Sequence, residues 1–282
     1  MNSNASVQLT AIERFRKLHE SGCFVLPNPW DVGTAVYLER LGFQALATTS
    51  AGYAFTRALP DSVLAISRDE MLNHVRELAG ATPLPVNADF QNGYADSPED
   101  VAISVALCIE TGVAGLSIED NTGQDASPLY ETRLAIERIK AARAAIDGAG
   151  VPVILTARCE AGLVGVEKPL AVTLERLVAF ADAGADCLYA PGLSEPDEIA
   201  AIVKAVSPKP VNVLMSKPSP SLPVSRLADL GVRRISVGSA LARVAWGAFI
   251  RSAREIAERG SFDTFGEAAS FKELDEVFDG RS

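Results

Sequence analysis

The sequence predicts a single α/β domain, a (β/α)8 barrel, on three observations. Eight short apolar segments alternate with segments of helical length along the 282 residues. A glycine repeatedly closes a helical segment just before an apolar one, as in LGFQAL, TGVAGL, AGADCL and LGVRRI. Several apolar segments end in charged side chains, as expected where ligands bind beyond the carboxyl ends of parallel strands. An open doubly wound sheet is the alternative, and the absence of G-x-G-x-x-G after the first strand disfavours it.

The expected elements follow from these patterns in chain order. Short apolar runs bounded by polar or glycine residues predict strands at 23–26, 44–49, 85–89, 115–119, 152–157, 187–190, 210–214 and 235–237. Apolar residues spaced by three and four predict helices at 11–21, 31–41, 68–79, 98–111, 131–147, 170–183, 194–206, 221–230, 239–259 and 265–278. We expect residues 1–10 to form a flexible tail, 11–259 the barrel, and 260–282 a C-terminal helical extension.

Composition limits the classes of function. The net charge of -10 argues against nucleic acid as a partner, because phosphate binding needs a basic surface. No apolar run is long enough to cross a membrane, and the N-terminus does not read as a signal peptide, so we expect a cytoplasmic protein. The four cysteines form no C-x-x-C pair, and only two histidines are present. Any metal here is therefore expected to be a hard ion held by carboxylates and water.

Charged residues at the ends of neighbouring strands are the first candidates for a site. Asp89 and Glu119 end the third and fourth strands, so they are expected to be neighbours and to bind Mg²⁺ or Mn²⁺. Surface or helix-capping acids are the alternative for both. Arg158, at the end of the fifth strand, can hold a carboxylate or phosphonate with its two-pronged guanidinium. Its alternative role is an ion pair with Glu119 or Glu160.

Two further segments are candidates for substrate binding. The turn Ser50-Ala51-Gly52 follows the second strand, where its backbone N–H groups can donate to a carboxylate or enolate oxygen. Taken alone, it is also consistent with an ordinary tight turn. Asn212 is a polar residue in an otherwise apolar strand, which indicates either a ligand contact or a hydrogen bond at the mouth of the barrel.

A series of motifs in a fixed order gives a more specific signal. They are LPNPWDVGTA (26–35), TTSAGY (48–53), VNADFQNGY (86–94), GVAGLSIED (112–120), TARCEA (156–161), AGADCLYAPG (183–192), PVNVL (210–214) and LGVRRISVGSAL (230–241). Together they resemble the isocitrate lyase/phosphoenolpyruvate mutase superfamily over residues 15–249. The resemblance implies a (β/α)8 barrel, dependence on Mg²⁺, and a 2-oxo acid as substrate or product. It also implies a tetramer that exchanges its last barrel helix between subunits, which fits the long segment after the eighth strand. We expect a homotetramer or a homodimer.

The same resemblance assigns roles to individual residues. It implies that Asp89 and Glu119 bind the metal largely through water, and that the Ser50-Ala51-Gly52 turn and Arg158 bind the substrate. Asn212 joins them as a predicted substrate-binding residue because of its place in an apolar strand. It places Asp61 near the reacting centre. We therefore predict Asp61, Arg158 and Tyr53 as catalytic residues.

Two departures from the superfamily narrow the expected activity. Many members have D-A-D at the third strand, where this chain has Asn87-Ala88-Asp89 and so lacks one carboxylate. Isocitrate and methylisocitrate lyases carry K-K-C-G-H after the fourth strand, whereas residues 121–130 read NTGQDASPLY, without Lys, Cys or His. Cleavage of isocitrate is not expected, because the residues that serve as acid and base in those lyases are missing.

These considerations predict a lyase-type, Mg²⁺-dependent enzyme. It is expected to cleave or form a C–C or P–C bond next to a 2-oxo acid through a pyruvate-enolate-like intermediate. Oxaloacetate decarboxylation is the leading expectation, because it needs no dedicated base. The alternatives are a C–C hydrolase of oxaloacetate or an acylpyruvate, a phosphoenolpyruvate mutase or phosphonopyruvate hydrolase, and, from another class, a barrel that binds a metabolite without catalysis.

Overall fold

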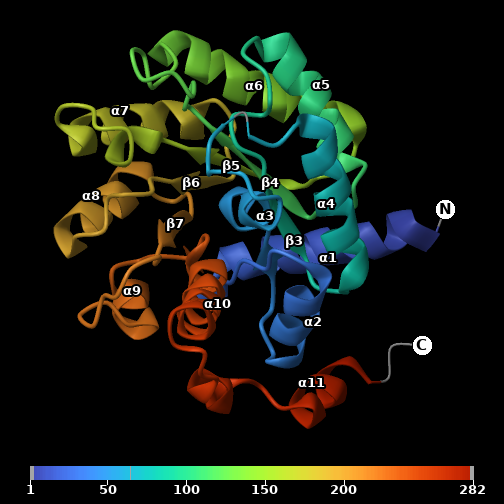
Figure 1. Ribbon diagram of the computed structural model, residues 1–282. Coiled ribbons are helices and arrows are strands. Elements are labelled where there is room, and N and C mark those ends of the chain that lie inside the picture. Colours follow the sequence, from blue (N-terminus) through green and yellow to red (C-terminus); the bar gives the residue numbers. More distant parts are fainter. Residues whose placement is uncertain (1–2, 64, 280–282) are drawn as a thin grey trace.

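The computed structural model describes residues 3–63 and 65–279 of the chain, and its centre is a parallel barrel (Figure 1). The strands are β1 (Phe24–Leu26), β2 (Leu46–Ala47), β3 (Val86–Asp89), β4 (Gly115–Glu119), β5 (Ile154–Arg158), β6 (Cys187–Tyr189), β7 (Val211–Leu214) and β8 (Arg234–Ser236). They pair in the order β1-β8-β7-β6-β5-β4-β3-β2, all parallel. The two outer strands of this order approach where the N–H of Ala47 donates to the carbonyl of Pro27 at 3.0 Å. The predicted (β/α)8 fold is confirmed.

Helices surround the barrel, and along the chain each strand is followed by at least one helix (Figure 1). They are α1 (Ser3–Glu20), α2 (Val32–Arg40), α3 (Ser50–Thr56), α4 (Arg68–Ala81), α5 (Pro98–Ile109), α6 (Thr132–Ala149), α7 (Pro169–Asp182), α8 (Pro196–Val206), α9 (Val224–Asp229), α10 (Ala240–Arg259) and α11 (Phe271–Phe278). Short 3-10 helices lie at η1 (Glu160–Gly162) and η2 (Asp263–Glu267). Capping residues begin several of them; Ser67, for example, accepts from the N–H of Glu70.

Helix α1 closes the end of the barrel opposite the carboxyl ends of the strands. Phe15 is fully buried, and a Cβ built on Gly115, the first residue of β4, would lie 2.8 Å from its ring. The structure differs here from the expected flexible tail, because α1 begins at Ser3; residues 1–2 lie outside the described part. Gln8 Nε2 donates to the carbonyl oxygens of Ile109 and Val113, at 2.9 and 3.1 Å, and so holds the start of α1 against the barrel.

The connection after β2 contains a helix that the sequence patterns do not indicate. Thr49 caps α3 by accepting from the N–H of Gly52 at 3.1 Å. A Cβ on Gly52 would lie 2.5 Å from Thr49 Cγ2, so only glycine fits beside this cap. The helix has 7 residues, too few for its apolar spacing to stand out in the sequence.

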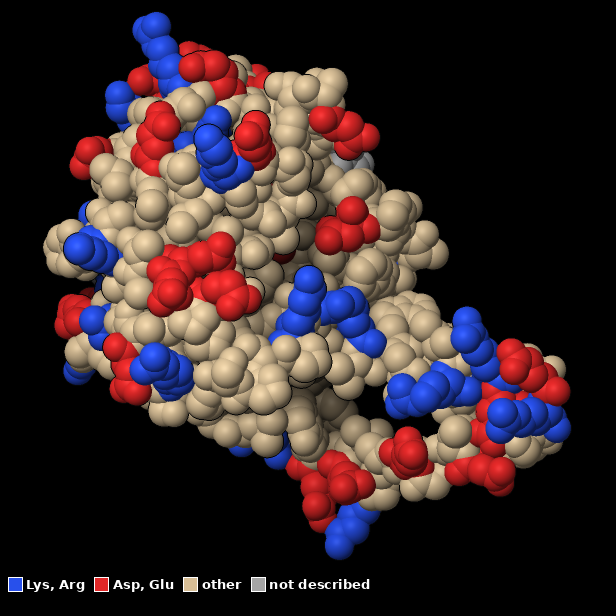
Figure 2. Space-filling view, turned by 90° about the vertical axis from the view of Figure 1, so that its left-hand side faces the viewer, with Lys and Arg blue, Asp and Glu red and all other residues tan. Residues whose placement is uncertain are grey.

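The chain ends in an arm that leaves the barrel and returns to α2. After α10, segment η2 leads to α11, which lies below α2 in Figure 1. Arg40, the last residue of α2, donates to the backbone oxygens of Glu276 and Asp279 at 2.8 and 2.7 Å. In Figure 2 part of the chain stands out from the barrel body and carries both basic and acidic side chains. No helix in residues 3–63 and 65–279 combines the length and apolarity that a membrane crossing requires.

Candidate active site

A cavity of about 370 Å³ opens at the carboxyl ends of the strands, and every strand contributes to its wall. The strand residues that line it are Leu26, Ala47, Asn87, Asp89, Ser117, Glu119, Arg158, Tyr189, Asn212, Leu214, Arg234 and Ser236. Loop residues and the start of α3 complete the wall, among them Ser50, Ala51, Asp61, Asn121 and Glu160. The cavity lies where the barrel fold places active sites.

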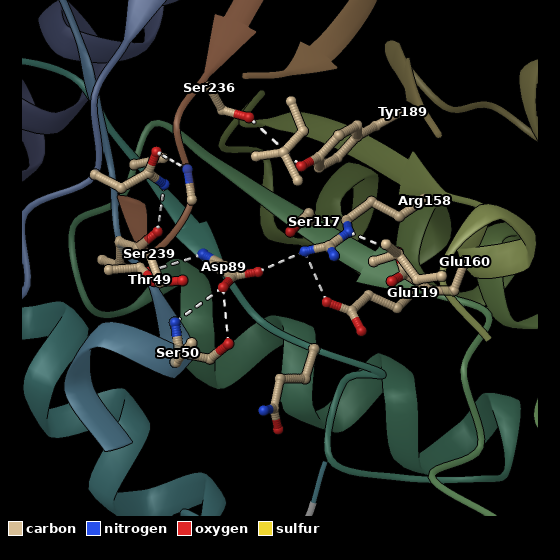
Figure 3. A pocket seen from close by; sticks show the side chains of 18 of the residues that line it. Thr49, Ser50, Asp89, Ser117, Glu119, Arg158, Glu160, Tyr189, Ser236 and Ser239 are labelled. Atoms are coloured by element: carbon tan, nitrogen blue, oxygen red, sulfur yellow. Dashed lines mark hydrogen bonds and ion pairs between the residues drawn. The ribbon is translucent and has the colours of Figure 1, made fainter. Parts of the chain in front are cut away.

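Arg158 is at the centre of the charged side of this cavity (Figure 3). Its Nη1 atom lies 2.7 Å from Asp89 Oδ1 and 2.7 Å from Glu119 Oε1, and its Nε atom lies 2.9 Å from Glu160 Oε1. Glu119 and Arg158 are paired residues on the neighbouring strands β4 and β5, which explains their contact. Burial alone would lower the pKa of Arg158, but the ion pairs with Glu119, Glu160 and Asp89 raise it well above its usual range.

The start of α3 fixes the second oxygen of Asp89. The backbone N–H and the hydroxyl of Ser50 both donate to Asp89 Oδ2, each at 2.9 Å. The backbone N–H of Asp89 donates to Thr48 Oγ1 at 2.9 Å. Ser50, predicted to donate to a substrate oxygen, therefore donates to Asp89 in this structure, and a substrate oxygen would have to share or replace that bond.

The cavity carries more acidic groups than its arginines balance. Asp61 lines it together with the three acids that contact Arg158. Burial raises the pKa of Glu119 well above its usual range; Arg158 opposes this shift, and Glu160, Asp89 and Asp61 add to it. The pKa of Asp61 is also raised, first by burial and then by Asp89, against the opposing effect of Arg158. A cation bound here would offset this unfavourable accumulation of charge.

The donor set fits a hard divalent ion that keeps part of its water. Asp89 and Glu119 converge on one nitrogen of Arg158, and Mg²⁺ is commonly held by one or two carboxylates plus water. Within the described ranges no group of three or more His, Cys, Asp or Glu side chains could hold a metal by itself. Asn87 has a buried Oδ1 without a partner among the described residues. Such an acceptor suits an ordered water.

A buried ion pair between Asp120 and Arg176 lies behind the acidic side of the cavity and fixes the backbone at Glu160. Asp120 Oδ1 accepts from the backbone N–H of Glu160 at 2.8 Å, and its Oδ2 lies 3.0 Å from Arg176 Nη1. Arg176 also donates to the carbonyl of Tyr130 at 2.8 Å, which joins α7 to the end of the loop after β4. The sequence analysis missed Arg176; the available signal was a charged residue on the apolar face of a helix, between Thr173 and Phe180.

The opposite side of the cavity is polar and carries no acidic residue among the described side chains that line it. Asn212, predicted from the sequence, lines it; its Nδ2 donates to Ser236 Oγ at 2.9 Å and its Oδ1 accepts from Arg234 Nε at 2.9 Å. Figure 3 shows Ser236 facing the hydroxyl of Tyr189. Neither Tyr189 nor Arg234 was predicted, because both lie in short apolar strands and contact residues far away in the sequence.

Most of the predicted site residues meet in this cavity. Those that line it are Ser50, Ala51, Asp61, Asp89, Glu119, Arg158 and Asn212. Tyr53 does not line it; its ring stacks on His74, with centroids 3.8 Å apart and planes at 11°. Gly52 is likewise not part of the wall, because it packs against Thr49. The catalytic role of Tyr53 therefore stays a prediction that the geometry does not support.

Comparison with known proteins agrees with the fold and the cavity. The profile of the phosphoenolpyruvate phosphomutase family matches residues 15–257. A Burkholderia cenocepacia J2315 protein described as a lyase/mutase is 47% identical in sequence, with a TM-score of 0.93 over 98% of both chains. Oxaloacetate acetylhydrolase, solved in complex with its product oxalate, is 27% identical, with a TM-score of 0.84 over 95% of this chain and 94% of that one. The 2-methylisocitrate lyase of Halalkalibacterium halodurans is 26% identical over 88% of this chain and 83% of its own.

The family match covers the whole barrel, from α1 to α10, and so includes every strand that lines the cavity. The motifs that carry the resemblance in sequence are the segments that form the cavity wall. The chain thus belongs to the phosphoenolpyruvate phosphomutase family and is a lyase-type enzyme of the isocitrate lyase/phosphoenolpyruvate mutase superfamily.

Proposed function

We propose that this protein is a Mg²⁺-dependent enzyme (Mn²⁺ being the alternative ion) that cleaves the C–C bond next to a 2-oxo acid, with oxaloacetate decarboxylation as the leading reaction. One observation carries the proposal: Asp89 and Glu119 converge on a single nitrogen of Arg158 inside the cavity. Two acids able to hold a divalent ion thus stand beside a guanidinium able to hold a carboxylate. That pairing suits the chelating oxo and carboxylate oxygens of a 2-oxo acid.

In such a reaction different residues would hold the metal ion and the substrate. Asp89 and Glu119 would hold the ion, which when bound polarises the oxo group and offsets negative charge that develops on it. Arg158 orients the carboxylate next to the oxo group. The bond between C3 and C4 of oxaloacetate then breaks, CO₂ leaves, and the electron pair remains as the enolate of pyruvate. This cleavage needs no base, which accords with a loop at residues 121–130 that lacks Lys, Cys and His.

Hydrolysis of a C–C bond in oxaloacetate or an acylpyruvate is the second candidate. Asp61 favours it, because a carboxylate with a raised pKa is a better base toward a water molecule than an ordinary one. The likeness to oxaloacetate acetylhydrolase adds to this. A phosphoenolpyruvate mutase or phosphonopyruvate hydrolase is less well supported, because the loop at residues 121–130 offers no Lys to hold a phosphonate group.

We further propose that copies of the chain assemble through α10, as a homotetramer or homodimer. This helix exposes a row of large apolar side chains that the described chain leaves uncovered. The exposed residues are Leu241, Val244, Trp246, Phe249, Ile250 and Ile256. Between α3 and α10 lies an apolar groove of about 480 Å³, walled by Phe55, Leu59 and Trp246 among others. A second copy that exchanges its own α10 would cover both surfaces.

Pyruvate release, coupled to lactate dehydrogenase, tests the proposed reaction. Oxaloacetate, phosphonopyruvate and methylisocitrate are supplied with and without Mg²⁺. We expect oxaloacetate to give pyruvate only with metal. Asp89→Asn should abolish this turnover, whereas Asp147→Asn, an exposed control on α6, should not. Acetate and oxalate in place of pyruvate would indicate the hydrolase. Oxalate binding in calorimetry without any turnover would indicate a barrel that binds a metabolite and would overturn the proposal.

A further inference from the structure

A series of side-chain hydrogen bonds crosses the barrel on the side of the cavity opposite the acidic residues. It runs from Arg234 Nε to Asn212 Oδ1 at 2.9 Å, from Asn212 Nδ2 to Ser236 Oγ at 2.9 Å, and from Ser236 Oγ to the hydroxyl of Tyr189 at 3.5 Å. Its four residues come from β6, β7 and β8, and all of them line the cavity. All four are buried, so water competes little for these bonds.

The directions of the first two of these hydrogen bonds follow from Arg234, and the structure gives the direction of the third, from Ser236 to Tyr189. A guanidinium can only donate, so the amide atom of Asn212 that faces Arg234 must be the oxygen. The amide nitrogen therefore faces Ser236 and must donate to it. The oxygen of Ser236 then accepts, and the proton of Ser236 is free to point to the oxygen of Tyr189, as the donor direction in the structure has it.

The consequence is that the phenolic proton of Tyr189 is not used within the chain of bonds. No side chain in the described part of the protein accepts it, and the residue lines the cavity. Burial raises the pKa of Tyr189 to about 12, so the phenol keeps its proton at neutral pH. Arg158 lies over the ring, 4.8 Å from its centroid, where its charge stabilises a phenolate. Tyr189 is thus arranged to donate a proton into the cavity.

The charge of Arg234 has no acidic partner among the described side chains, although the residue is only 2% exposed. Its remaining contacts are neutral: Thr156 Oγ1 at 3.0 Å and His19 Nε2 at 3.3 Å. Burying an unpaired charge is costly, and a neutral residue could fill the space. An apolar residue of similar size, however, could not donate to Asn212 Oδ1 and so could not fix the orientation of that amide.

We propose that Tyr189 is the proton donor that converts the enolate into the product, and that Arg234 is the positioning residue that orients it through Asn212 and Ser236. This inference rests on the proposed function. In the step, the electron pair of the enolate forms a new C–H bond with the phenolic proton, and the O–H bond of Tyr189 breaks. The phenolate that remains regains its proton from solvent water once the product leaves. The same donor would serve in hydrolysis, where a carbanion-like acetate fragment must also be protonated.

Exchange of the pyruvate methyl protons with D₂O tests Tyr189 directly. This exchange is followed by proton NMR in the presence of Mg²⁺. It breaks a C–H bond of pyruvate, with the proton passing to the phenolate form of Tyr189, and forms a C–D bond, but it needs no cleavage of a C–C bond. Tyr189→Phe keeps the ring over Arg158 and should slow exchange by about 10²- to 10⁴-fold, the usual contribution of a general acid or base. Its affinity for oxalate, an enolate mimic, should stay close to that of the wild type. Tyr37→Phe removes an exposed hydroxyl on α2 and should change neither quantity.

The outcomes separate this inference from the proposed function. Exchange at the wild-type rate in Tyr189→Phe would overturn the role of Tyr189. So would a wild-type enzyme that decarboxylates oxaloacetate but does not exchange the protons of pyruvate, and both results leave the proposed function standing. A wild-type enzyme that turns over no substrate of the panel overturns both.

Arg234 is tested by comparing two substitutions. Arg234→Met removes the donor that orients Asn212, and we expect exchange to slow by at least tenfold while oxalate still binds. Arg234→Lys can still donate to Asn212 Oδ1 and should recover part of the rate. A purely structural role would lower the melting temperature of both variants without this difference. Exchange no faster in the Lys variant than in the Met variant would overturn the positioning role.

Discussion

Arg158 joins three acids that reach it from β3, β4 and the segment after β5. The side chains of Asp89, Glu119 and Glu160 are 18, 8 and 4% exposed, so little water screens them from one another. In such a cluster the guanidinium removes an electrostatic cost that the three carboxylates would otherwise impose on the fold. The residue that is proposed to bind substrate is therefore also a structural residue.

Replacing Arg158 by Met should destabilise the protein by about 3–5 kcal/mol at pH 7.5, as is usual when one partner of a buried ion pair is removed. The loss should be smaller at pH 5. Burial already raises the pKa of Glu119 and of Glu160, so without Arg158 these acids take up protons as the pH falls. Urea denaturation at pH 7.5 and at pH 5 measures the loss in the free energy of unfolding at each pH. Arg158→Lys keeps the charge and is the control; an equal loss for the Met variant at the two pH values would contradict the explanation.

His19 shows how a buried neutral histidine is fixed in one form. Its Nδ1 lies 2.7 Å from the carbonyl of Phe15, so Nδ1 carries the hydrogen. Its Nε2 faces a nitrogen of Arg234 at 3.3 Å and must accept from it. A second proton would place an imidazolium against the guanidinium. Burial, and then Arg234, accordingly lower the pKa of His19 to about 3.

This shift predicts a loss of stability in acid. Between pH 6.5 and about 3 the unfolded chain binds a proton at residue 19 that the folded chain does not. The contribution of neutral His19 to the free energy of unfolding is thus fully present above pH 6.5. It declines as the pH falls, by at most about 1.4 kcal/mol per pH unit. His19→Gln should make the free energy of unfolding less sensitive to pH between 7 and 5. His74, with its own pKa lowered to about 4, is present in both proteins and cancels in the comparison. Equal slopes would refute the assignment.

At the scale of elements, α11 is held to α2 by few contacts. Both described bonds from Arg40 go to backbone oxygens near the end of α11. The largest apolar residues of α11 stay exposed, Phe271 at 88%, Leu274 at 42% and Phe278 at 44%. A segment with so little buried surface is expected to open independently of the barrel.

Arg40→Ala should release this segment. We expect faster cleavage between residues 260 and 279 in limited proteolysis, because two hydrogen bonds of about 1 kcal/mol each are lost. Unfolding of the barrel, followed by circular dichroism, should change little. Lys272→Ala removes an exposed ion pair with Glu276 on α11 and should leave the cleavage rate near that of the wild type. Similar rates for both variants would show that Arg40 does not hold α11.

At the scale of the whole molecule, the exposed face of α10 is the feature that a single chain does not explain. Val244 and Phe249 are 70 and 60% exposed, on a helix of 20 residues. Apolar faces of this size are usually covered by a partner. The proposed assembly through α10 accounts for this face.

Light scattering at micromolar concentration should find a dimer or a tetramer. Phe249→Glu places a charge in the proposed interface and should shift the protein toward smaller species. Ile103→Glu, at an exposed apolar position on α5, is the matched control and should leave the mass unchanged. A wild-type protein that is monomeric at this concentration would exclude the assembly.

Local sequence patterns predicted most of the elements because their causes are local. Strand and helix positions follow from apolar spacing, and glycine closes helices where a positive φ is required, as at Gly150. The features that the sequence patterns did not predict also have physical causes. Helix α3 is too short to show a period, and the start of α1 depends on contacts of Gln8 with residues more than 100 positions away. Tyr53 was placed in the site by its motif, but α3 turns its ring toward His74.

By itself, the sequence determined the fold class, the family motifs and the acids at the strand ends. Only the tertiary structure decided that Asp89 and Glu119 share one nitrogen of Arg158, and that Arg234 orients Asn212. The physical reason is the separation along the sequence over which each kind of interaction acts. Backbone preferences and apolar periods act over a few residues, whereas these contacts join residues up to 69 positions apart. Their geometry depends on the register of neighbouring strands and on closure of the barrel, which no local pattern encodes.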